Sequence, residues 1–355
     1  MQKPLSSCLL PLLAAALTAA SSAHAAEENT GSTSQPIISG SASPSSQNAV
    51  VMLVHVENGN GGETCTATLV ASNLLITARH CVSETGKQPF YCDKNGKVQN
   101  DGNGGGEVGA DYKATDLYVF TGTTRPVFNG TTPAQAAARG KKIFHDNATA
   151  VCGHDLALVL LENNVSSTIP LARIRLDSQA SKGEKITAVG WGVTLDTKYP
   201  AQRQQRTGIP IVQVGPYSDD RVDVPGNDFL VGESTCSGDS GGPGFSEDTG
   251  ALIGVVSRGG NGKDATNPAD GCTNADNDYT QTAPFKSLIQ SAFNESGNSP
   301  LVETGRPTNN GSGGDDGGCS ASPASSRSMG AGAGLVALGI ALATVRRTRR
   351  RRIHS

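Results

Sequence analysis

Between residues 37 and 293, short apolar runs alternate with clusters of Gly, Asn, Asp and Pro. This alternation constrains the fold more than any other feature of the sequence. The runs span 49–56, 66–77, 117–121, 156–161, 186–191 and 252–257. Several are rich in β-branched residues and each is bounded by turn-forming residues, which predicts strands of an all-β barrel or sandwich. Glycine accounts for 44 of the 355 residues, nearly twice the average usage of roughly 7 %, and this disfavours long helices.

One helix is expected at the end of this region. Phe285, Leu288, Ile289 and Phe293 recur at spacings of 0, 3, 4 and 8 residues, which forms an apolar helical stripe. The body of the chain is acidic, because residues 26–318 contain 21 basic and 32 acidic residues. That balance argues against a nucleic-acid partner, since binding to phosphates requires excess positive charge.

The first 25 residues have the order of an export signal. Lys3 lies near the start, residues 9–17 are apolar, and Ala23-His24-Ala25 provides the small-x-small spacing that a signal peptidase requires. We expect residues 1–25 to be a signal peptide, residues 26–36 to be a short propeptide or N-terminal extension, and the protein to be exported.

The composition of the C-terminal region predicts a flexible linker followed by a membrane segment. Residues 296–318 are rich in Gly, Ser and Pro and are expected to form a flexible linker. Residues 329–345 are apolar and precede an arginine cluster, so an apolar helix could span a bilayer with its arginines on the cytoplasmic side. Residues 319–355, which begin with Cys319, resemble the myxobacterial C-terminal sorting tail, the MYXO-CTERM type.

That resemblance implies cleavage at or near Cys319 by a sorting protease. The product would be displayed on the cell surface or outer membrane, or released outside the cell. A permanent tail anchor with an incidental cysteine is the alternative. In either case the protein would contact the membrane through its tail before any processing.

The remaining cysteines fit an oxidising compartment. Without Cys8 and Cys319, six are left, an even number that allows fifteen pairings and predicts three disulfides: Cys65, Cys81, Cys92, Cys152, Cys236 and Cys272. Their spacing does not match a zinc site. The oxygen-rich run at 101–106 lacks the pattern of a calcium loop, which favours a solvated loop over a calcium site. No metal and no cofactor are expected.

A glycine-rich segment presents a candidate nucleophile. In Gly238-Asp239-Ser240-Gly241-Gly242-Pro243 the glycines let the backbone turn sharply around Ser240 and direct two amide hydrogens at one point. This segment also matches the Gly-x-Ser-x-Gly motif around the nucleophile of α/β-hydrolases. That fold needs a catalytic histidine after the serine, and the only histidine after Ser240 is His354, which lies within the arginine tail. The subtilisin order needs an aspartate before the histidine, and Asp93, the first in the chain, follows His80.

The order that remains is His80, Asp155, Ser240. Thr77-Ala78-Arg79-His80-Cys81, His154-Asp155-Leu156-Ala157-Leu158 and the serine segment resemble the three signatures of trypsin/chymotrypsin-like serine proteases. Gly190-Trp191-Gly192 and the spacing of Cys65 and Cys81 agree with this resemblance. It covers about 37–293 and implies a protease domain over 37–295, built from two packed six-stranded antiparallel β-barrels with a C-terminal helix.

The resemblance also implies roles for individual residues. Ser240 would attack a peptide carbonyl and form an acyl-enzyme, His80 would carry the proton, and Asp155 would orient the imidazole. The amides of Gly238 and Ser240 would form the oxyanion hole. We therefore expect a serine endopeptidase that acts on proteins or peptides. The alternative is a trypsin-fold binding or adhesive module without turnover.

Activation and specificity are further implications of the resemblance. Ile37-Ile38-Ser39-Gly40 is similar to the family's new N-terminus, whose ammonium pairs with the aspartate that is Asp239 here. Pro36 precedes it in place of Arg or Lys, so either the activating protease is unusual or the mature end lies elsewhere. Ser234 would lie at the floor of the specificity pocket, with Ser257 and Gly259 beside it; Ser257 would also contact Asp155.

A serine at the pocket floor favours small or apolar substrate residues, because trypsin has aspartate there. Asp276 and Asp278 precede Tyr279 in the segment expected to line the opposite wall, and a one-residue shift could put a carboxylate inside. The resemblance further implies the disulfides Cys65–Cys81 and Cys236–Cys272. Cys92–Cys152 then follows and would tie an insertion at 84–111 to the strand of Asp155.

Overall fold

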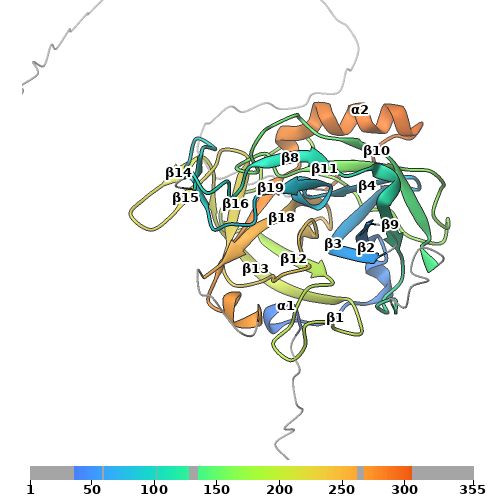
Figure 1. Cartoon of the computed structure of the whole chain (residues 1–355), viewed down its shortest axis with the longest axis horizontal. Helices are drawn as coiled ribbons and strands as arrows, with labels where there is room; N and C mark the ends of the chain where they lie inside the picture. The colour runs from blue at the N-terminus through green and yellow to red at the C-terminus, as the bar shows by residue number, and fades with distance from the viewer. Residues whose placement is uncertain (1–35, 58–59, 101, 128–134, 262–267, 306–355) are drawn as a thin grey trace, which may run out of the picture. The chain divides into compact units, whose positions relative to one another are not determined.

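The computed structural model describes residues 36–57, 60–100, 102–127, 135–261 and 268–305 (Figure 1). Six antiparallel strands close into a first barrel, in the order β10-β11-β4-β3-β2-β9. They are β2 (Val50–Glu57), β3 (Asn60–Ala71), β4 (Leu74–Thr77), β9 (Leu117–Phe120), β10 (Ala138–Phe144) and β11 (Ala157–Leu161). Inward-facing side chains fill this barrel, as the period of two along a strand requires; they include Val51, Leu53, Leu69, Leu75, Val119 and Val159.

A second barrel follows along the chain. Its strands are β12 (Lys185–Gly190), β13 (Gln204–Val214), β16 (Asp228–Val231), β17 (Pro243–Ser246), β18 (Leu252–Gly260) and β19 (Asp276–Gln281). They are antiparallel neighbours in the order β13-β12-β17-β18-β19-β16, and pairing between β13 and β16 closes the ring. The short strand β1 (Ser41–Ala42) extends the sheet at β13. The prediction of two six-stranded antiparallel barrels is confirmed.

Helix α2 (Lys286–Ser296) packs against β4 and β11 of the first barrel. Its stripe residues Ile289 and Phe293 are buried, as predicted, and they share one core cluster with Leu158 of the first barrel and Leu252 of the second. Gly297 ends the helix with a left-handed backbone (φ 72°), a conformation that glycine adopts without steric cost. The helix therefore helps to fix the two barrels against each other.

Several short elements lie outside the barrel strands. The segment α1 (Pro36–Ser39) precedes β1. Residues 84–111, predicted as an insertion, contain β6 (Tyr91–Cys92) and β7 (Val98–Gln99), and their ends pair as β5 (Ser83–Thr85) with β8 (Val108–Asp111). β14 (Tyr217–Ser218) and β15 (Asp223–Val224) form a hairpin. The insertion thus contains short paired strands outside the run at 101–106, for which a solvated loop was expected.

Three disulfides join Cys65 to Cys81, Cys92 to Cys152 and Cys236 to Cys272, with Cα separations of 6.1, 5.5 and 5.5 Å. This is the pairing that the resemblance implied. The first bridge connects β3 to the turn of His80, and the second connects the insertion to the segment before Asp155. Two of the three disulfides therefore brace the surroundings of the predicted site residues.

The chain continues to contact the barrels after α2. Val302 bridges Ile174, and Arg175, which is 1 % exposed, pairs with both Glu184 and Glu303. The first part of the expected linker at 296–318 is thus held by a buried ion cluster.

The predicted signal peptide at 1–25, most of the propeptide, the end of the linker and the sorting tail with Cys319 lie outside the described residues. No helix within the described ranges is long and apolar enough to cross a membrane.

Candidate active site

The turn after β4 positions His80. This short 3₁₀ turn covers Arg79–Cys81, and the disulfide of Cys81 ties it to β3. Arg79 is buried (5 % exposed) and pairs with Asp111 at the end of the insertion. The imidazole is therefore carried on a turn that is held from both sides.

Asp155 lies just before β11 and holds His80 through two contacts. Its Oδ1 accepts a hydrogen bond from the His80 backbone amide at 2.9 Å, and its Oδ2 lies 2.8 Å from His80 Nδ1. Ser257 from β18 donates a third hydrogen bond to Oδ2 at 2.7 Å. The carboxylate is only 1 % exposed, so its contacts come from the two barrels and not from water.

These contacts set the charge states of the pair. Burial alone would raise the pKa of Asp155, but the charge and hydrogen bonds of His80 and the hydroxyl of Ser257 hold it below its ordinary value. Burial lowers the pKa of His80, yet the charge and hydrogen bond of Asp155 outweigh it, so the net shift is upward. The geometry favours an ionised carboxylate behind an imidazole that gains a proton readily.

The Ser240 loop packs directly against the turn of His80. The Ser240 carbonyl accepts a hydrogen bond from the Thr66 amide at 2.8 Å, and Thr66 Oγ1 donates to the Gly238 carbonyl at 2.9 Å. A Cβ at Gly241 would lie 2.1 Å from Thr77 Oγ1 and 2.7 Å from the Ala78 nitrogen. Only glycine permits this approach, so Gly241 lets the serine loop and the histidine turn meet.

Gly238 also adopts a backbone conformation that favours glycine. Its φ is +97°, and its Cα position lies against Gly192, where an added Cβ would be 3.0 Å from the Gly192 Cα. The segment therefore turns sharply just before Ser240, as the glycine pattern predicted.

Comparisons with known proteins agree with this arrangement. A family model described as Trypsin matches residues 37–281. The chain belongs to the trypsin family. It is also similar to Trypsin-1 of Astacus astacus, with 26 % identity over 207 residues that cover 55 % of this chain and 76 % of the relative.

Asp239, which precedes Ser240, has a different environment from Asp155. It is 1 % exposed, and its two oxygens accept hydrogen bonds from the Gly192 amide at 2.7 Å and the Cys236 amide at 3.0 Å. Burial raises its pKa to about 7, although these amides and the charge of Arg125 act in the opposite direction. Among the described residues of this trypsin-family chain, the Asp239 carboxylate is thus hydrogen-bonded to amides and forms no ion pair.

Ile37, the predicted activation residue, lies in the second barrel's core. It is fully buried among apolar side chains that include Ile186 and Ile209. Its φ of +39° is unusual for a β-branched residue. Pro36 precedes it, so its nitrogen belongs to a peptide bond and is uncharged in the uncleaved chain.

A buried asparagine, Asn277, lies beside the segments of the predicted specificity residues Ser234 and Gly259. Ser234 is fully buried, and next to it Thr235 Oγ1 donates a 2.7 Å hydrogen bond to Asn277 Oδ1. Asn277, on β19, is 2 % exposed, and its Oδ1 would lie 2.5 Å from a Cβ at Gly259. The Asn277 amide therefore lies between Thr235 and Gly259, a feature that the sequence prediction missed.

Asp276 and Asp278 lie on the other face of β19. Successive side chains along a strand point to opposite faces, and while Asn277 contacts Thr235, Asp278 is 3.2 Å from the guanidinium of Arg258. The one-residue shift considered from the sequence, which would bring a carboxylate toward Ser234, is therefore not the observed register.

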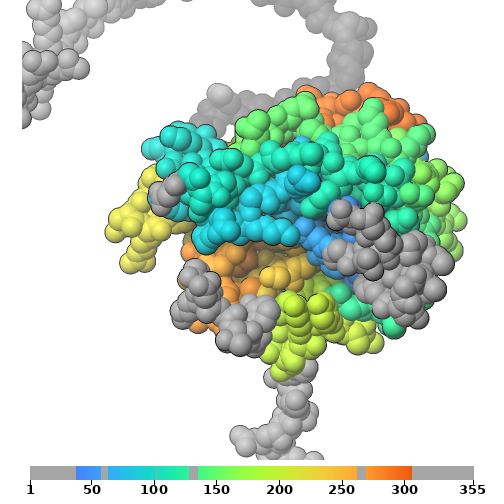
Figure 2. All heavy atoms as spheres, viewed as in Figure 1, coloured from blue at the N-terminus to red at the C-terminus, as the bar shows by residue number. Residues whose placement is uncertain are grey.

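A cleft runs past His80 between the insertion and β18. Figure 2 shows the molecular surface hollowed between the insertion, in cyan, and the orange segment that includes β18. A cavity of about 200 Å³ is lined by His80, Asp155 and Ser257, and also by Phe90 and Arg258. The sequence indicated the insertion at 84–111, but not that Phe90 of the insertion and Arg258 lie beside His80.

Proposed function

We propose that this member of the trypsin family is an exported serine endopeptidase that hydrolyses peptide bonds through His80, Asp155 and Ser240. The observation that carries this proposal is the buried carboxylate of Asp155, which binds the backbone and imidazole of His80 and the hydroxyl of Ser257. A binding module would have no use for a carboxylate that orients an imidazole toward a cleft.

The mechanism follows from the residue types. His80 takes the proton of Ser240 as the hydroxyl attacks the substrate carbonyl, and then gives that proton to the leaving amine. Asp155 fixes the tautomer of His80 and stabilises the imidazolium that forms. The amides of Gly238 and Ser240 donate to the developing oxyanion. Water then releases the acyl group by the same proton transfers in reverse.

A fluorophosphonate probe tests the proposal because it labels only an activated serine. We expect labelling of the processed protein, loss of labelling in Ser240→Ala, and retained labelling in Ser237→Ala, which changes an exposed serine of the same loop. Correctly processed, folded protein that is neither labelled nor able to cleave a peptide library would favour the non-catalytic module.

Processing between Pro36 and Ile37 would complete the site. It would give Ile37 a charged amine, and Asp239 would offer that amine a buried carboxylate of opposite charge. N-terminal sequencing of the active enzyme tests this step. An active species that still carries Gln35 would contradict it.

The substrate residue on the acyl side of the cut bond would be small. Two features support this preference: Ser234 provides no carboxylate, and the Thr235–Asn277 hydrogen bond narrows the space beside Gly259. We expect a peptide library to be cut after small residues, and Asn277→Gly to admit larger ones. A strong preference for Arg or Lys at this position would overturn this part of the proposal.

The protein would be exported. Its tail would then be cleaved near Cys319, which would display the protein on the cell surface or release it. Three disulfides support an oxidising destination. Mass spectrometry of the secreted protein would test both ends, because it would show whether residues 1–25 and the segment after Cys319 are present.

A further inference from the structure

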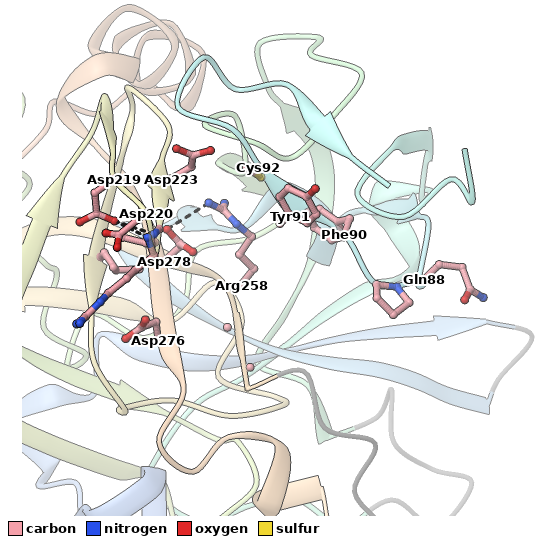
Figure 3. Close-up of a pocket in the computed structure, with 16 residues that line it drawn as sticks. Gln88, Phe90, Tyr91, Cys92, Asp219, Asp220, Asp223, Arg258, Asp276 and Asp278 are labelled. Atoms are coloured by element: carbon pink, nitrogen blue, oxygen red, sulfur yellow. Dashed lines mark hydrogen bonds and ion pairs between the residues drawn. The ribbon is translucent and has the colours of Figure 1, made fainter. Parts of the chain in front are cut away.

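A second and larger cavity lies further along the cleft. Its volume is about 610 Å³. Figure 3 shows Phe90 and Tyr91 of the insertion on one side and a group of aspartates on the other, with Arg258 between them. The aspartates come from the β14–β15 hairpin and from β19, and the insertion, β16 and β18 supply the rest of the lining, so segments far apart in the chain build this space.

The larger cavity adjoins the smaller one beside His80. Gln88, Phe90 and Arg258 line both. A peptide bound across His80 could therefore place one of its other side chains in the larger cavity.

The charge of Arg258 is already matched within the protein. Its Nη1 lies 2.9 Å from Oδ2 of Asp228, which is fully buried, and its Nη2 lies 3.2 Å from Oδ1 of Asp278. Five aspartates but only two arginines, Arg221 and Arg258, line the cavity. The lining therefore has an excess of negative charge after Arg258 is paired.

One carboxylate oxygen lacks a hydrogen-bond donor. Oδ1 of Asp223, which lines the cavity, is buried and has no hydrogen-bond partner among the described residues. A buried acceptor without a donor is destabilising, and the positive charge of a cation near this carboxylate would offset that cost. The pKa of Asp278 also reflects the negative charge of this lining. Burial raises this pKa to about 7, the charges of Asp228 and Asp276 add to the rise, and the charge of Arg258 opposes it.

The opposite wall suits the stem of a long basic side chain. Tyr91 is 67 % exposed, so its ring is open to contact, and Phe90 lies beside it. Lysine and arginine pack their aliphatic stems on apolar surface and place their charge over aromatic faces or near carboxylates.

We propose that this cavity is a substrate subsite that binds a lysine or arginine side chain at a position removed from the cut bond. The inference rests on the proposed function and adds a second requirement to it. The enzyme would need a small residue at the cut bond and would gain rate from a basic residue elsewhere in the same peptide. The ammonium or guanidinium would lie near Asp220 and Asp223, with its stem against Phe90 and Tyr91.

Peptide kinetics on the processed enzyme test the subsite. Fluorogenic peptides keep alanine before the cut bond and carry lysine, norleucine or alanine at each other position in turn. We expect lysine at one position to raise kcat/KM about tenfold over both norleucine and alanine. The preference should shrink at high ionic strength, because salt screens partly exposed charges.

Two variants connect the preference to the cavity. Asp220→Asn combined with Asp223→Asn should abolish the preference for lysine and leave cleavage of the all-alanine peptide unchanged. Asp248→Asn, which removes an exposed charge outside the cavity, should keep the preference.

The subsite is overturned if lysine is no better than norleucine at every position, or if the preference survives in the double variant. Failure of the proposed function looks different, since then no peptide is cleaved and no probe is bound.

Discussion

Asp155 and Asp239 are both 1 % exposed, but the pKa values of these two carboxylates shift in opposite directions. Asp155 has an imidazole and a hydroxyl as neighbours, and the net shift of its pKa is downward. Asp239 has two backbone amides, and its pKa rises to about 7. Desolvation acts on both, so the partners of a buried acid decide its charge, not the depth of its burial.

The two carboxylates differ in whether their contacts are already made before any cleavage of the chain. The contacts of Asp155 with His80 and Ser257 are complete in the uncleaved chain. Asp239 would gain a comparable partner only when a cation reaches it, and the proposed amine of Ile37 is that cation. The two sites should therefore respond differently to mutation and to pH.

The largest expected effect concerns Asp155→Asn. An amide cannot stabilise the imidazolium and favours the wrong tautomer of His80. In the trypsin family itself the corresponding change lowers kcat by about 10⁴, and we carry that value over to this chain. Steady-state kinetics of the processed variant provide the measurement. A loss of less than tenfold would show that Asp155 does not orient the catalytic base.

Asp239→Asn should be the next most damaging change. If an ammonium at Ile37 is buried against Asp239, removing the carboxylate leaves that charge unpaired, at a cost of about 3–5 kcal/mol. The processed variant should then lose about 10³ in kcat/KM. The uncleaved chain should fold normally, as circular dichroism and thermal melting can show. Full activity of the processed variant would refute the proposed activation.

The stability of the uncleaved chain should fall as pH rises between about 4 and 7. The folded state keeps a proton on Asp239 up to about pH 7, whereas the unfolded state loses it near 3.8. Stability therefore decreases through this window, by roughly 4 kcal/mol at most for a shift of this size.

Urea unfolding of the Ser240→Ala chain at pH 5 and pH 8 measures this dependence without self-cleavage. Adding Asp239→Asn should flatten the profile, whereas adding Asp248→Asn should not. Identical profiles for all three proteins would mean that Asp239 is already ionised at pH 5.

The smallest expected effect belongs to Ser257→Ala. It removes one of the hydrogen bonds to the Asp155 carboxylate, so kcat/KM should fall about tenfold, the size of one hydrogen bond to a charged group. Ser246→Ala removes a comparable bond to Glu184 in the second barrel and should leave the rate unchanged. Equal losses in both variants would indicate general destabilisation.

The strands were predictable because their patterns are local. The run at 156–161 has turn residues on both sides and became β11, and the stripe of Ile289 and Phe293 became the buried face of α2. The order of His80, Asp155 and Ser240 was readable for a similar reason, since each lies in a short segment with its own composition. The three segments were assigned to one site only by resemblance.

The surroundings of the site were less readable. Arg258 follows Ser257 directly in the sequence, but its partners Asp228 and Asp278 come from two other strands. Asn277 and Asp278 are neighbours whose roles depend on which face of β19 each one occupies. A shift of one residue would exchange those faces, and only strand pairing fixes the register.

The sequence by itself indicated the strand pattern and the three short segments that contain His80, Asp155 and Ser240, and it predicts an export signal, because each of these patterns depends on residues close together in the chain. Tertiary structure decided that the insertion lies along the cleft, that Asn277 narrows the space beside Gly259, and that Asp239 has no ion-pair partner in the part of the chain that the structure describes. Those properties arise from contacts between segments that are distant in sequence, and burial and strand register become defined only when the two barrels have formed.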